Sequence, residues 1–224
     1  MSESDVQSVR RRPGMYLGGT DERALHKLPE EILNNAFAEA VTTHGDLIEI
    51  TLRKDGSILI ADNGRGIPID NHPKFPGKSA VEIIFTMLSL GYRFSDRREF
   101  QPANASLTVS ACIVNALSDW LWVEVVRNNT LYRQSYSKGN PTSKLVNEGP
   151  TNERRGTTVC FRPDPEIFGD NATFNPAILY EMAQSRAMLY GGVEIRWVCE
   201  TEIADGKTPS EQSFHYPNRI SGAD

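Results

Sequence analysis

The chain has 224 residues, of which 39% are hydrophobic and 24% are charged, and its formal net charge is −5. This length and composition are typical of a globular protein with one sizeable core or two small ones. The negative charge argues against tight DNA binding by this segment alone, because phosphate neutralisation requires a clustered basic surface.

Two further properties of the sequence concern its environment. No apolar run approaches the roughly 18 residues of a membrane helix, and the polar N-terminus lacks the apolar segment of a signal peptide. Cys112, Cys160 and Cys199 are far apart and match no metal-binding or disulfide pattern. We therefore expect a cytoplasmic protein without membrane contact, whose thiols are reduced and buried.

The N-terminal part of the chain predicts an arm followed by a helix. Residues 1–20 are polar and contain several prolines and glycines, which predict an irregular N-terminal arm. Residues 21–224 are expected to form a single domain. Helix signals begin near Asp21 and continue to about Thr43, with a break or kink expected at Pro29.

Glu31, Asn35 and Glu39 form a polar stripe on this helix, because residues four apart lie on one helical face. Such a stripe is usually just the solvated face of an amphipathic helix. A carboxylate can also polarise a water molecule, and an amide oxygen is a suitable ligand for Mg²⁺. The stripe alone leaves both interpretations open.

A predicted hairpin follows the helix and ends at an aspartate. Alternating apolar residues predict a half-buried strand over 47–53, and Asp55-Gly56 is a hairpin turn signal. Residues 57–61 return as the partner strand and lead directly into Asp62.

Residues 62–68, with the sequence Asp-Asn-Gly-Arg-Gly-Ile-Pro, lie where this second strand must turn. The two glycines allow positive φ angles and a close backbone approach, and the proline fixes the exit direction. An aspartate at the end of a buried strand is costly unless a donor binds it, and the amino group of a flat ligand would be such a donor. A plain turn after a hairpin is the alternative interpretation.

The rest of the chain predicts helices and hairpin-linked strands. Helices are predicted over 79–90, 107–118 and 175–190, and strands over 120–127, 130–137, 157–162, 193–199 and 212–216. Because these elements do not follow a strict βαβ alternation, they indicate an α+β fold.

The ordered motifs resemble those of the GHKL ATPases, and within them the N-terminal ATPase domain of the bacterial type II topoisomerase B subunits, GyrB and ParE. The matching stretches cover nearly the whole chain and are residues 12–18, 31–39, 62–68, 114–118, 132–134, 155–157 and 214–216. The resemblance implies a Bergerat-type two-layer α/β sandwich, with helices on one face of a mixed sheet and the nucleotide between them. The mismatch-repair, chaperone and histidine-kinase branches of the family match less well.

The resemblance also implies a role for each matching residue. Glu31 would be the catalytic base that activates water for attack on the γ-phosphate, and Asn35 would ligate Mg²⁺. Asp62 would accept a hydrogen bond from the adenine amino group, and Thr157 would share this contact through a water. Gly66, Ile67 and Pro68 would line the nucleotide pocket. Glu39, Arg65 and Arg133 would form its rim, where aminocoumarin inhibitors would also bind, with Arg65 paired to Glu39.

ATP and Mg²⁺ are the cofactors that the resemblance implies. ATP binding would dimerise the domain, and a longer full-length protein would act on DNA with a gyrase A- or ParC-like subunit. Catalysis would also require a lysine from a following domain. The N-terminal arm is shorter than in the family, since only nine residues precede Arg10.

One stretch departs from the family pattern. The family closes a glycine-rich lid over the phosphates, but the corresponding residues 104–110 contain no glycine. None occurs from Tyr92 to Lys138, although 17 glycines spread evenly over 224 residues would place three or four in those 47 positions. Glycines in such a loop let backbone N–H groups face the phosphates.

Two functions therefore remain open. In the first, the hydroxyls of Ser106, Thr108 and Ser110 partly replace the lost N–H contacts and the domain is a weak ATPase. In the second, the protein binds nucleotides or inhibitors in its adenine pocket but has lost ATP hydrolysis.

Overall fold

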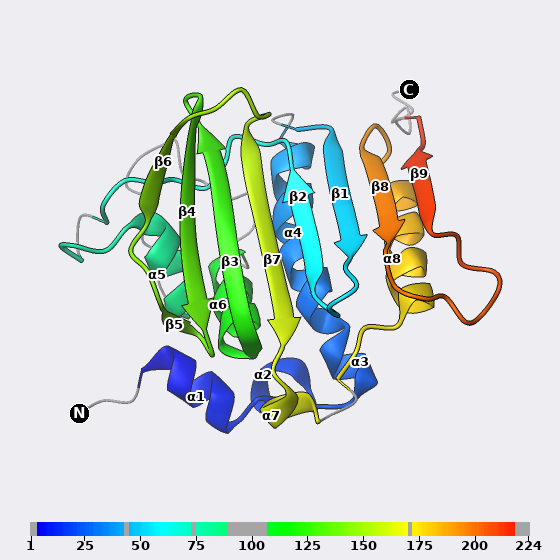
Figure 1. Ribbon diagram of the computed structural model, residues 1–224, viewed down its shortest axis with the longest axis horizontal. Coiled ribbons are helices and arrows are strands. Elements are labelled where there is room, and N and C mark those ends of the chain that lie inside the picture. The colour runs from blue at the N-terminus through cyan, green and yellow to red at the C-terminus, as the bar shows by residue number, and fades with distance from the viewer. Residues whose placement is uncertain (1–3, 43–44, 73–74, 89–106, 170–171, 218–224) are drawn as a thin grey trace, which may run out of the picture.

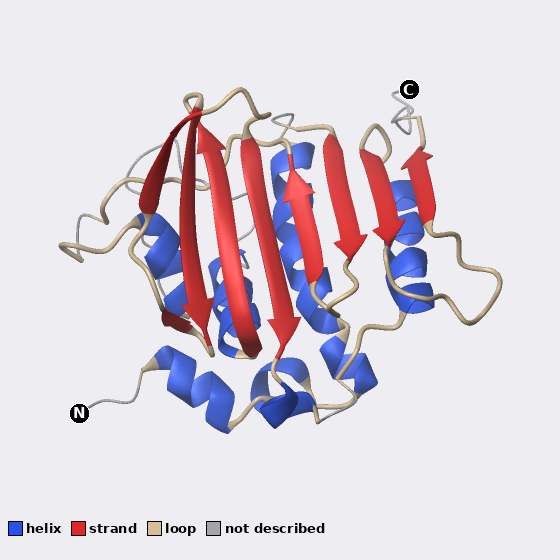
Figure 2. Ribbon diagram, viewed as in Figure 1, coloured by secondary structure: helices blue, strands red, loops and turns tan. Residues whose placement is uncertain are grey.

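The computed structural model describes residues 4–42, 45–72, 75–88, 107–169 and 172–217, which form a sheet with helices on one face (Figures 1 and 2). The strands are β1 (Leu47–Leu52), β2 (Ile58–Asp62), β3 (Ser118–Arg127), β4 (Thr130–Ser137), β5 (Asn140–Pro141), β6 (Val146–Pro150), β7 (Gly156–Pro163), β8 (Glu194–Cys199) and β9 (Glu211–His215). Their order in the sheet is β5-β4-β3-β7-β2-β1-β8-β9, with β6 also paired to β4. The sheet is mixed, because β1 and β8 are parallel and the other described pairs are antiparallel.

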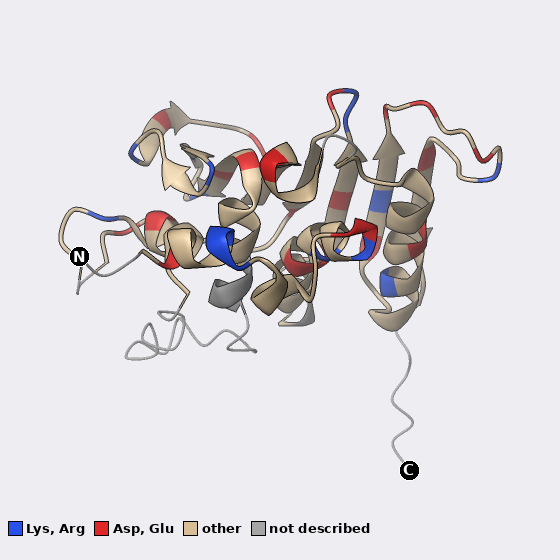
Figure 3. Cartoon of the chain, turned by 90° about the horizontal axis from the view of Figure 1, so that it is seen from below, with Lys and Arg blue, Asp and Glu red and all other residues tan. Residues whose placement is uncertain are grey.

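The helices occupy one side of the sheet and its lower end. They are α1 (Asp5–Arg11), α2 (Gly14–Leu17), α3 (Glu22–Leu25), α4 (Lys27–Val41), α5 (Ala80–Thr86), α6 (Leu107–Ala116), α7 (Pro165–Phe168) and α8 (Pro176–Leu189). In Figure 1, α4, α5, α6 and α8 lie behind the sheet, while α1, α2, α3 and α7 line its lower end. The view from below in Figure 3 shows the long helices that lie behind the sheet gathered on one side of the strands.

The core lies between the sheet and these helices. Val123, Val159, Ile60 and Ile50 stand in one row across β3, β7, β2 and β1, and all four are buried. Branched side chains of this kind pack well on a pleated, half-buried surface. Because side chains alternate along a strand, every second residue of β3 and β7 faces the helices and the next faces away from them.

The expected fold is confirmed: a mixed sheet with helices on one face, in the α+β class. The three cysteines are free and buried, as expected. None of the helices in the described part of the chain is long and apolar enough to cross a membrane.

The prediction of an irregular N-terminal arm is wrong for residues 5–11 and 14–17, which form α1 and α2. Ser4 caps α1 by accepting from the Gln7 N–H, and Val6 and Val9 are buried one turn apart. The helix breakers in this region separate the two short helices and do not prevent them. Gly18 ends α2 with a φ of +82°.

The single helix expected from Asp21 to Thr43 is two helices, α3 and α4, which meet at His26 and not at Pro29. Pro29 lies in the first turn of α4, where its missing N–H costs nothing because those N–H groups have no intrahelical partner. The helix expected over 79–90 is described only as α5, which ends at Thr86. β5, β6 and α7 were not expected from the sequence.

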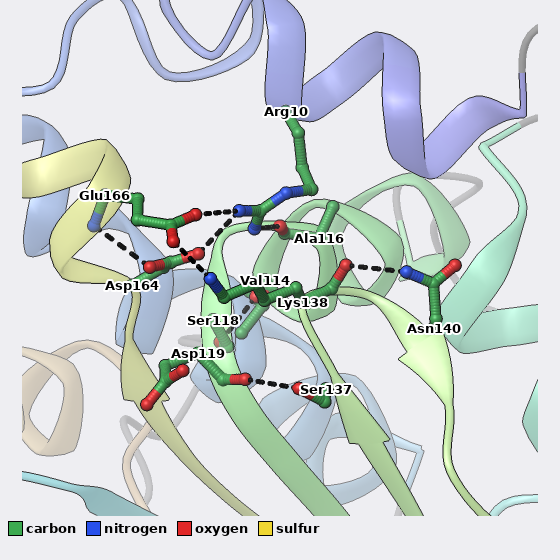
Figure 4. A network of polar contacts seen from close by, with 10 residues as sticks. All are labelled: Arg10, Val114, Ala116, Ser118, Asp119, Ser137, Lys138, Asn140, Asp164 and Glu166. Atoms are coloured by element: carbon green, nitrogen blue, oxygen red, sulfur yellow. Dashed lines mark hydrogen bonds and ion pairs between the residues drawn. The ribbon is translucent and has the colours of Figure 1, made fainter.

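An ion-pair network anchors α1 beneath the sheet (Figure 4). Arg10 Nη2 lies 2.6 Å from Asp164 Oδ2, and Arg10 Nη1 donates to the carbonyl of Ala116 at 2.7 Å. Asp164 is fully buried. Glu166 lies within reach of Arg10 and pairs with Lys138. The network fastens α1 to the end of α6 and to the segment that follows β7.

Candidate nucleotide-binding site

Asp62 lies at the end of β2 and is held by two backbone groups. Its Oδ1 accepts from the N–H of Gly64 at 2.8 Å and from the N–H of Thr157 at 3.4 Å. The other oxygen, Oδ2, has no hydrogen-bond partner among the described residues. The polar atoms of these residues that are both unpaired and fully buried do not include Oδ2, and therefore it is accessible. Asp62 therefore presents one carboxylate oxygen that a ligand can reach.

The environment of Asp62 makes its charge costly. Burial is the largest cause that raises its pKa to about 7, and the negative charge of Glu39 adds to the effect. The hydrogen bonds from Gly64 and Thr157 act in the opposite direction. Near neutral pH the carboxyl group is thus balanced between its two forms, and a ligand N–H donor would favour the ionised one.

The loop after Asp62 is fixed by contacts at one peptide group, the one between Gly66 and Ile67. Its N–H donates to Thr157 Oγ1 at 3.1 Å, and its carbonyl oxygen accepts from Arg127 Nη1 at 2.9 Å. Gly66 has a φ of +77°, and a Cβ atom there would lie 3.0 Å from Val125 Cγ1. Only glycine fits this position without strain.

The start of β7 approaches the same loop even more closely. Gly156 has a φ of +143°, and a Cβ atom added to it would lie 1.9 Å from the carbonyl oxygen of Asp62. This close approach brings Thr157, the next residue, against both Asp62 and Ile67.

Glu39 of α4 and Arg65 of the loop form the expected pair. Arg65 Nε lies 3.1 Å from Glu39 Oε2, and Arg65 Nη2 lies 2.9 Å from Glu39 Oε1. The backbone N–H of Arg65 also donates to Glu39 Oε2 at 3.2 Å. The side-chain hydrogen bonds with Glu39, and the charge of Glu39, raise the pKa of Arg65. Together with the backbone contact they tie the loop to the helix.

Because Glu39 touches the loop, the polar stripe of α4 leads away from Asp62 along the helix. At about 1.5 Å per residue, Asn35 lies about 6 Å and Glu31 about 12 Å further along the axis. Both residues are half-buried, and neither side chain forms a hydrogen bond or ion pair with another described residue. This spacing matches an elongated ligand whose two ends require different chemistry.

Arg133 is not brought together with the other predicted site residues. It is paired in register with Glu124, and its side chain forms an ion pair with that residue and lies over the Trp122 ring, 5.7 Å from its centroid. Glu124 pairs in turn with Thr158, and therefore Arg133 faces away from the helices while Thr157 faces them. Its role at the rim of the pocket stays a prediction.

Arg127 was not expected from the sequence, yet it contacts the loop through Gly66. An arginine at the end of a strand gives no signal of its own, because its contact depends on the pairing of β3 with β7. The predicted lid window, residues 104–110, lies outside the described residues up to Ser106, and its last four residues begin α6.

Residues 20–167 match the family described as "Histidine kinase-, DNA gyrase B-, and HSP90-like ATPase". The chain is 47% identical over 217 residues to the B subunit of DNA topoisomerase 4 from Bartonella bacilliformis, and the match covers 96% of this chain and 31% of that protein. It is 41% identical over 216 residues to the protein of the same name from Staphylococcus aureus, with the same coverage. The chain therefore spans about a third of the length of these relatives.

Among solved structures, the chain is similar to the 43K ATPase domain of Thermus thermophilus gyrase B in complex with an aminocoumarin. The TM-score is 0.81 at 36% identity, and the match covers 95% of this chain and 52% of that chain. The family model, the relatives and the fold agree with the motifs read from the sequence. On this evidence the chain belongs to the ATPase family that includes histidine kinases, DNA gyrase B and HSP90, and within it resembles the ATPase domains of gyrase B and of the topoisomerase IV B subunits.

Proposed function

We propose that this domain binds ATP and hydrolyses it as part of a type II DNA topoisomerase, in the manner of gyrase B and the topoisomerase IV B subunits. The observation that carries the proposal is the accessible Oδ2 of Asp62, held at the end of a fixed loop. A carboxylate in this position selects a ligand that donates a hydrogen bond from a flat ring, as the 6-amino group of adenine does.

The base and the phosphates would lie at opposite ends of the α4 stripe. Asp62 and Thr157 bind the adenine edge, and Gly66, Ile67 and Pro68 line the pocket beside it. Glu39 and Arg65 form its rim, where an aminocoumarin binds as well. The family resemblance alone adds Arg133 to that rim, because its side chain pairs with Glu124 on the other face of the sheet. Glu31, about 12 Å further along the helix from Glu39, is the general base that activates the attacking water.

Asn35 would hold Mg²⁺ through its amide oxygen. The described residues contain no group of three or more His, Cys, Asp or Glu side chains that could hold a metal ion. This fits an ion that is bound by one amide oxygen and by the oxygens of the substrate, as Mg²⁺ commonly is. When bound, the ion supplies charge compensation for the phosphates.

The full-length protein would dimerise when ATP binds and would act on DNA together with a gyrase A- or ParC-like subunit. The topoisomerase relatives are about three times as long as this chain, which supports a role as one domain of such a protein. We expect slow turnover by the domain alone, because the family also uses a lysine from a following domain.

A second candidate is a nucleotide- or inhibitor-binding protein that has lost hydrolysis. The observation that favours it is the absence of glycine from Tyr92 to Lys138, where the family has its phosphate-binding lid. In this case the adenine pocket is intact and the triphosphate is held weakly.

Calorimetry with two ligands distinguishes the candidates. A non-hydrolysable ATP analogue with Mg²⁺ tests the whole site, and an aminocoumarin tests the adenine pocket and its rim. Binding of both supports the ATPase, and binding of the aminocoumarin alone supports the non-hydrolysing protein. If neither ligand binds, both proposals are wrong.

A turnover assay then tests the assigned base. Glu31→Ala is expected to abolish ATP hydrolysis while the analogue still binds. Glu30→Ala is the matched control, because Glu30 is the preceding residue on α4 and pairs with Arg186 instead. Hydrolysis that survives Glu31→Ala would show that another group activates the water.

A further inference from the structure

Arg127 differs from the other arginines of the sheet in what it contacts. Arg133 pairs with Glu124, Arg162 pairs with Asp119, and both stack on tryptophans. Within the described part of the chain Arg127 forms no ion pair, and its one side-chain hydrogen bond goes to the carbonyl of Gly66. Its guanidinium therefore binds the loop and not a carboxylate.

That bond and the Thr157 bond act on the same peptide group. The carbonyl oxygen of Gly66 is held by Arg127, and the N–H of Ile67 is held by Thr157 Oγ1. A peptide group is planar, so fixing both its oxygen and its N–H fixes its rotation. Gly66 would otherwise rotate easily, because it lacks a Cβ atom.

The fixed peptide has a consequence for Thr157. Its hydroxyl oxygen is occupied by the N–H of Ile67, while its hydroxyl hydrogen has no acceptor among the described residues. The hydrogen is therefore available to an acceptor on a ligand, directly or through a water. The backbone N–H of the same residue holds Asp62 Oδ1, so the donor and the acceptor of the site are set together.

We propose that Arg127 is a positioning residue that fixes the Gly66–Ile67 peptide and thereby sets Asp62 and Thr157 to read the amino edge of adenine. This inference rests on the proposed function, since it assumes that an adenine nucleotide is the ligand. In this role Arg127 acts through the loop and not through a contact with the base.

The pairing of acceptor and donor predicts that the site selects adenine over guanine. Adenine offers an amino donor beside a ring acceptor, which complements a carboxylate acceptor beside a hydroxyl donor. Guanine offers the reverse pattern at the same positions. Loss of the Arg127 bond frees the peptide to turn, and the hydroxyl of Thr157 then loses its fixed direction.

The test compares two ligands on one variant. One ligand is a non-hydrolysable ATP analogue with Mg²⁺, and the other is the same analogue built on purine, which lacks the 6-amino group. In the unchanged chain, removal of the amino group is expected to weaken binding about tenfold or more, because the carboxylate contact is charge-assisted. In Arg127→Ala the ATP analogue is expected to bind about tenfold more weakly, and removal of the amino group costs about threefold or less.

Two further variants separate positioning from general damage. Arg127→Lys keeps a cationic donor and is expected to recover part of the lost discrimination. Arg162→Ala is the matched control, because Arg162 is a sheet arginine that pairs with Asp119 and stacks on Trp120. It is expected to leave the ratio of the two affinities unchanged. Thermal unfolding of each variant shows whether the fold is intact.

The outcomes separate this inference from the function on which it rests. If the unchanged chain does not bind the ATP analogue, the proposed function fails. If that chain binds it and Arg127→Ala weakens both ligands by the same factor, or neither, the positioning role is wrong while ATP binding stands. Loss of discrimination in Arg127→Ala with recovery in Arg127→Lys supports the role.

Discussion

Replacement of Asp62 by asparagine should stabilise the fold while it damages the site. Asparagine keeps an oxygen that can accept from the N–H groups of Gly64 and Thr157. It removes the carboxylate charge that burial disfavours. The side chain that would recognise the ligand is therefore also a source of instability in the protein without ligand.

The size of the expected gain in the free energy of unfolding follows from the raised pKa of Asp62. The pKa of Asp62 is about 7 in the folded protein and 3.8 in the reference state. An acidic group whose pKa is raised in the folded protein lowers the free energy of unfolding as the pH rises between these two values. The loss is complete above about pH 7. At about 1.4 kcal/mol per pKa unit, asparagine should gain at most about 4 kcal/mol at pH 8 and about 1.5 kcal/mol at pH 5.

Thermal and urea unfolding at pH 5 and pH 8, without nucleotide, measure this difference. A gain of about 4 kcal/mol corresponds to a rise of about 8–16 °C in Tm for a chain of this size. Asp205→Asn is a control of opposite sign, because hydrogen bonds from Thr208 lower the pKa of Asp205, and its replacement should not stabilise the protein at pH 8. An Asp62→Asn variant that is less stable than the unchanged chain, or equally more stable at both pH values, would refute the reasoning.

Three other predictions concern the same structure. The ionised form of Asp62 accepts the adenine amino group, and therefore the affinity for an ATP analogue should fall about tenfold from pH 8 to pH 6. Binding near pH 7 should also release protons, which calorimetry in buffers of different ionisation enthalpy would measure. An unchanged pH dependence in Asp62→Asn would contradict this. Gly66→Ala should abolish measurable nucleotide binding, because a Cβ atom there would meet Val125 and Val126, whereas Gly77→Ala, which has a similar positive φ but nothing within 4 Å of its Cβ position, should bind normally in the same titration. Arg10→Ala should lower the free energy of unfolding by about 3–5 kcal/mol in urea, because it leaves the fully buried Asp164 without its cation; a loss below about 1 kcal/mol, typical of an exposed pair, would mean that solvent reaches Asp164.

The parts of the site that could be predicted from the sequence are those with local patterns. The loop around Asp62 was recognisable because glycines, a proline and the preceding strand occur within a few residues. The stripe of Glu31, Asn35 and Glu39 follows from helical periodicity. The contact between Glu39 and Arg65 came from the family resemblance and is confirmed by the structure.

The contacts that sequence reasoning missed depend on the pairing of distant strands. Arg127 reaches Gly66 only because β3 pairs with β7, whose first residues press against the loop. The side of the sheet on which Arg133 lies is likewise set by register, because a shift of one residue reverses the face. In α1, the spacing of Val6 and Val9 was a weak signal beside the prolines and glycines that follow, and burial against the rest of the core outweighed it.

The parallel pairing of β1 with β8 has a consequence for how the chain folds while it is being synthesised. Glu49 lies beside Arg196, and residues so far apart in the sequence cannot meet until most of the chain has left the ribosome. Until then β1 is an edge strand with the apolar residues Ile48 and Ile50, and such an edge can pair with other chains. A nascent or truncated chain that ends before Glu194 is therefore expected to aggregate, even though it already contains every residue of the proposed nucleotide site.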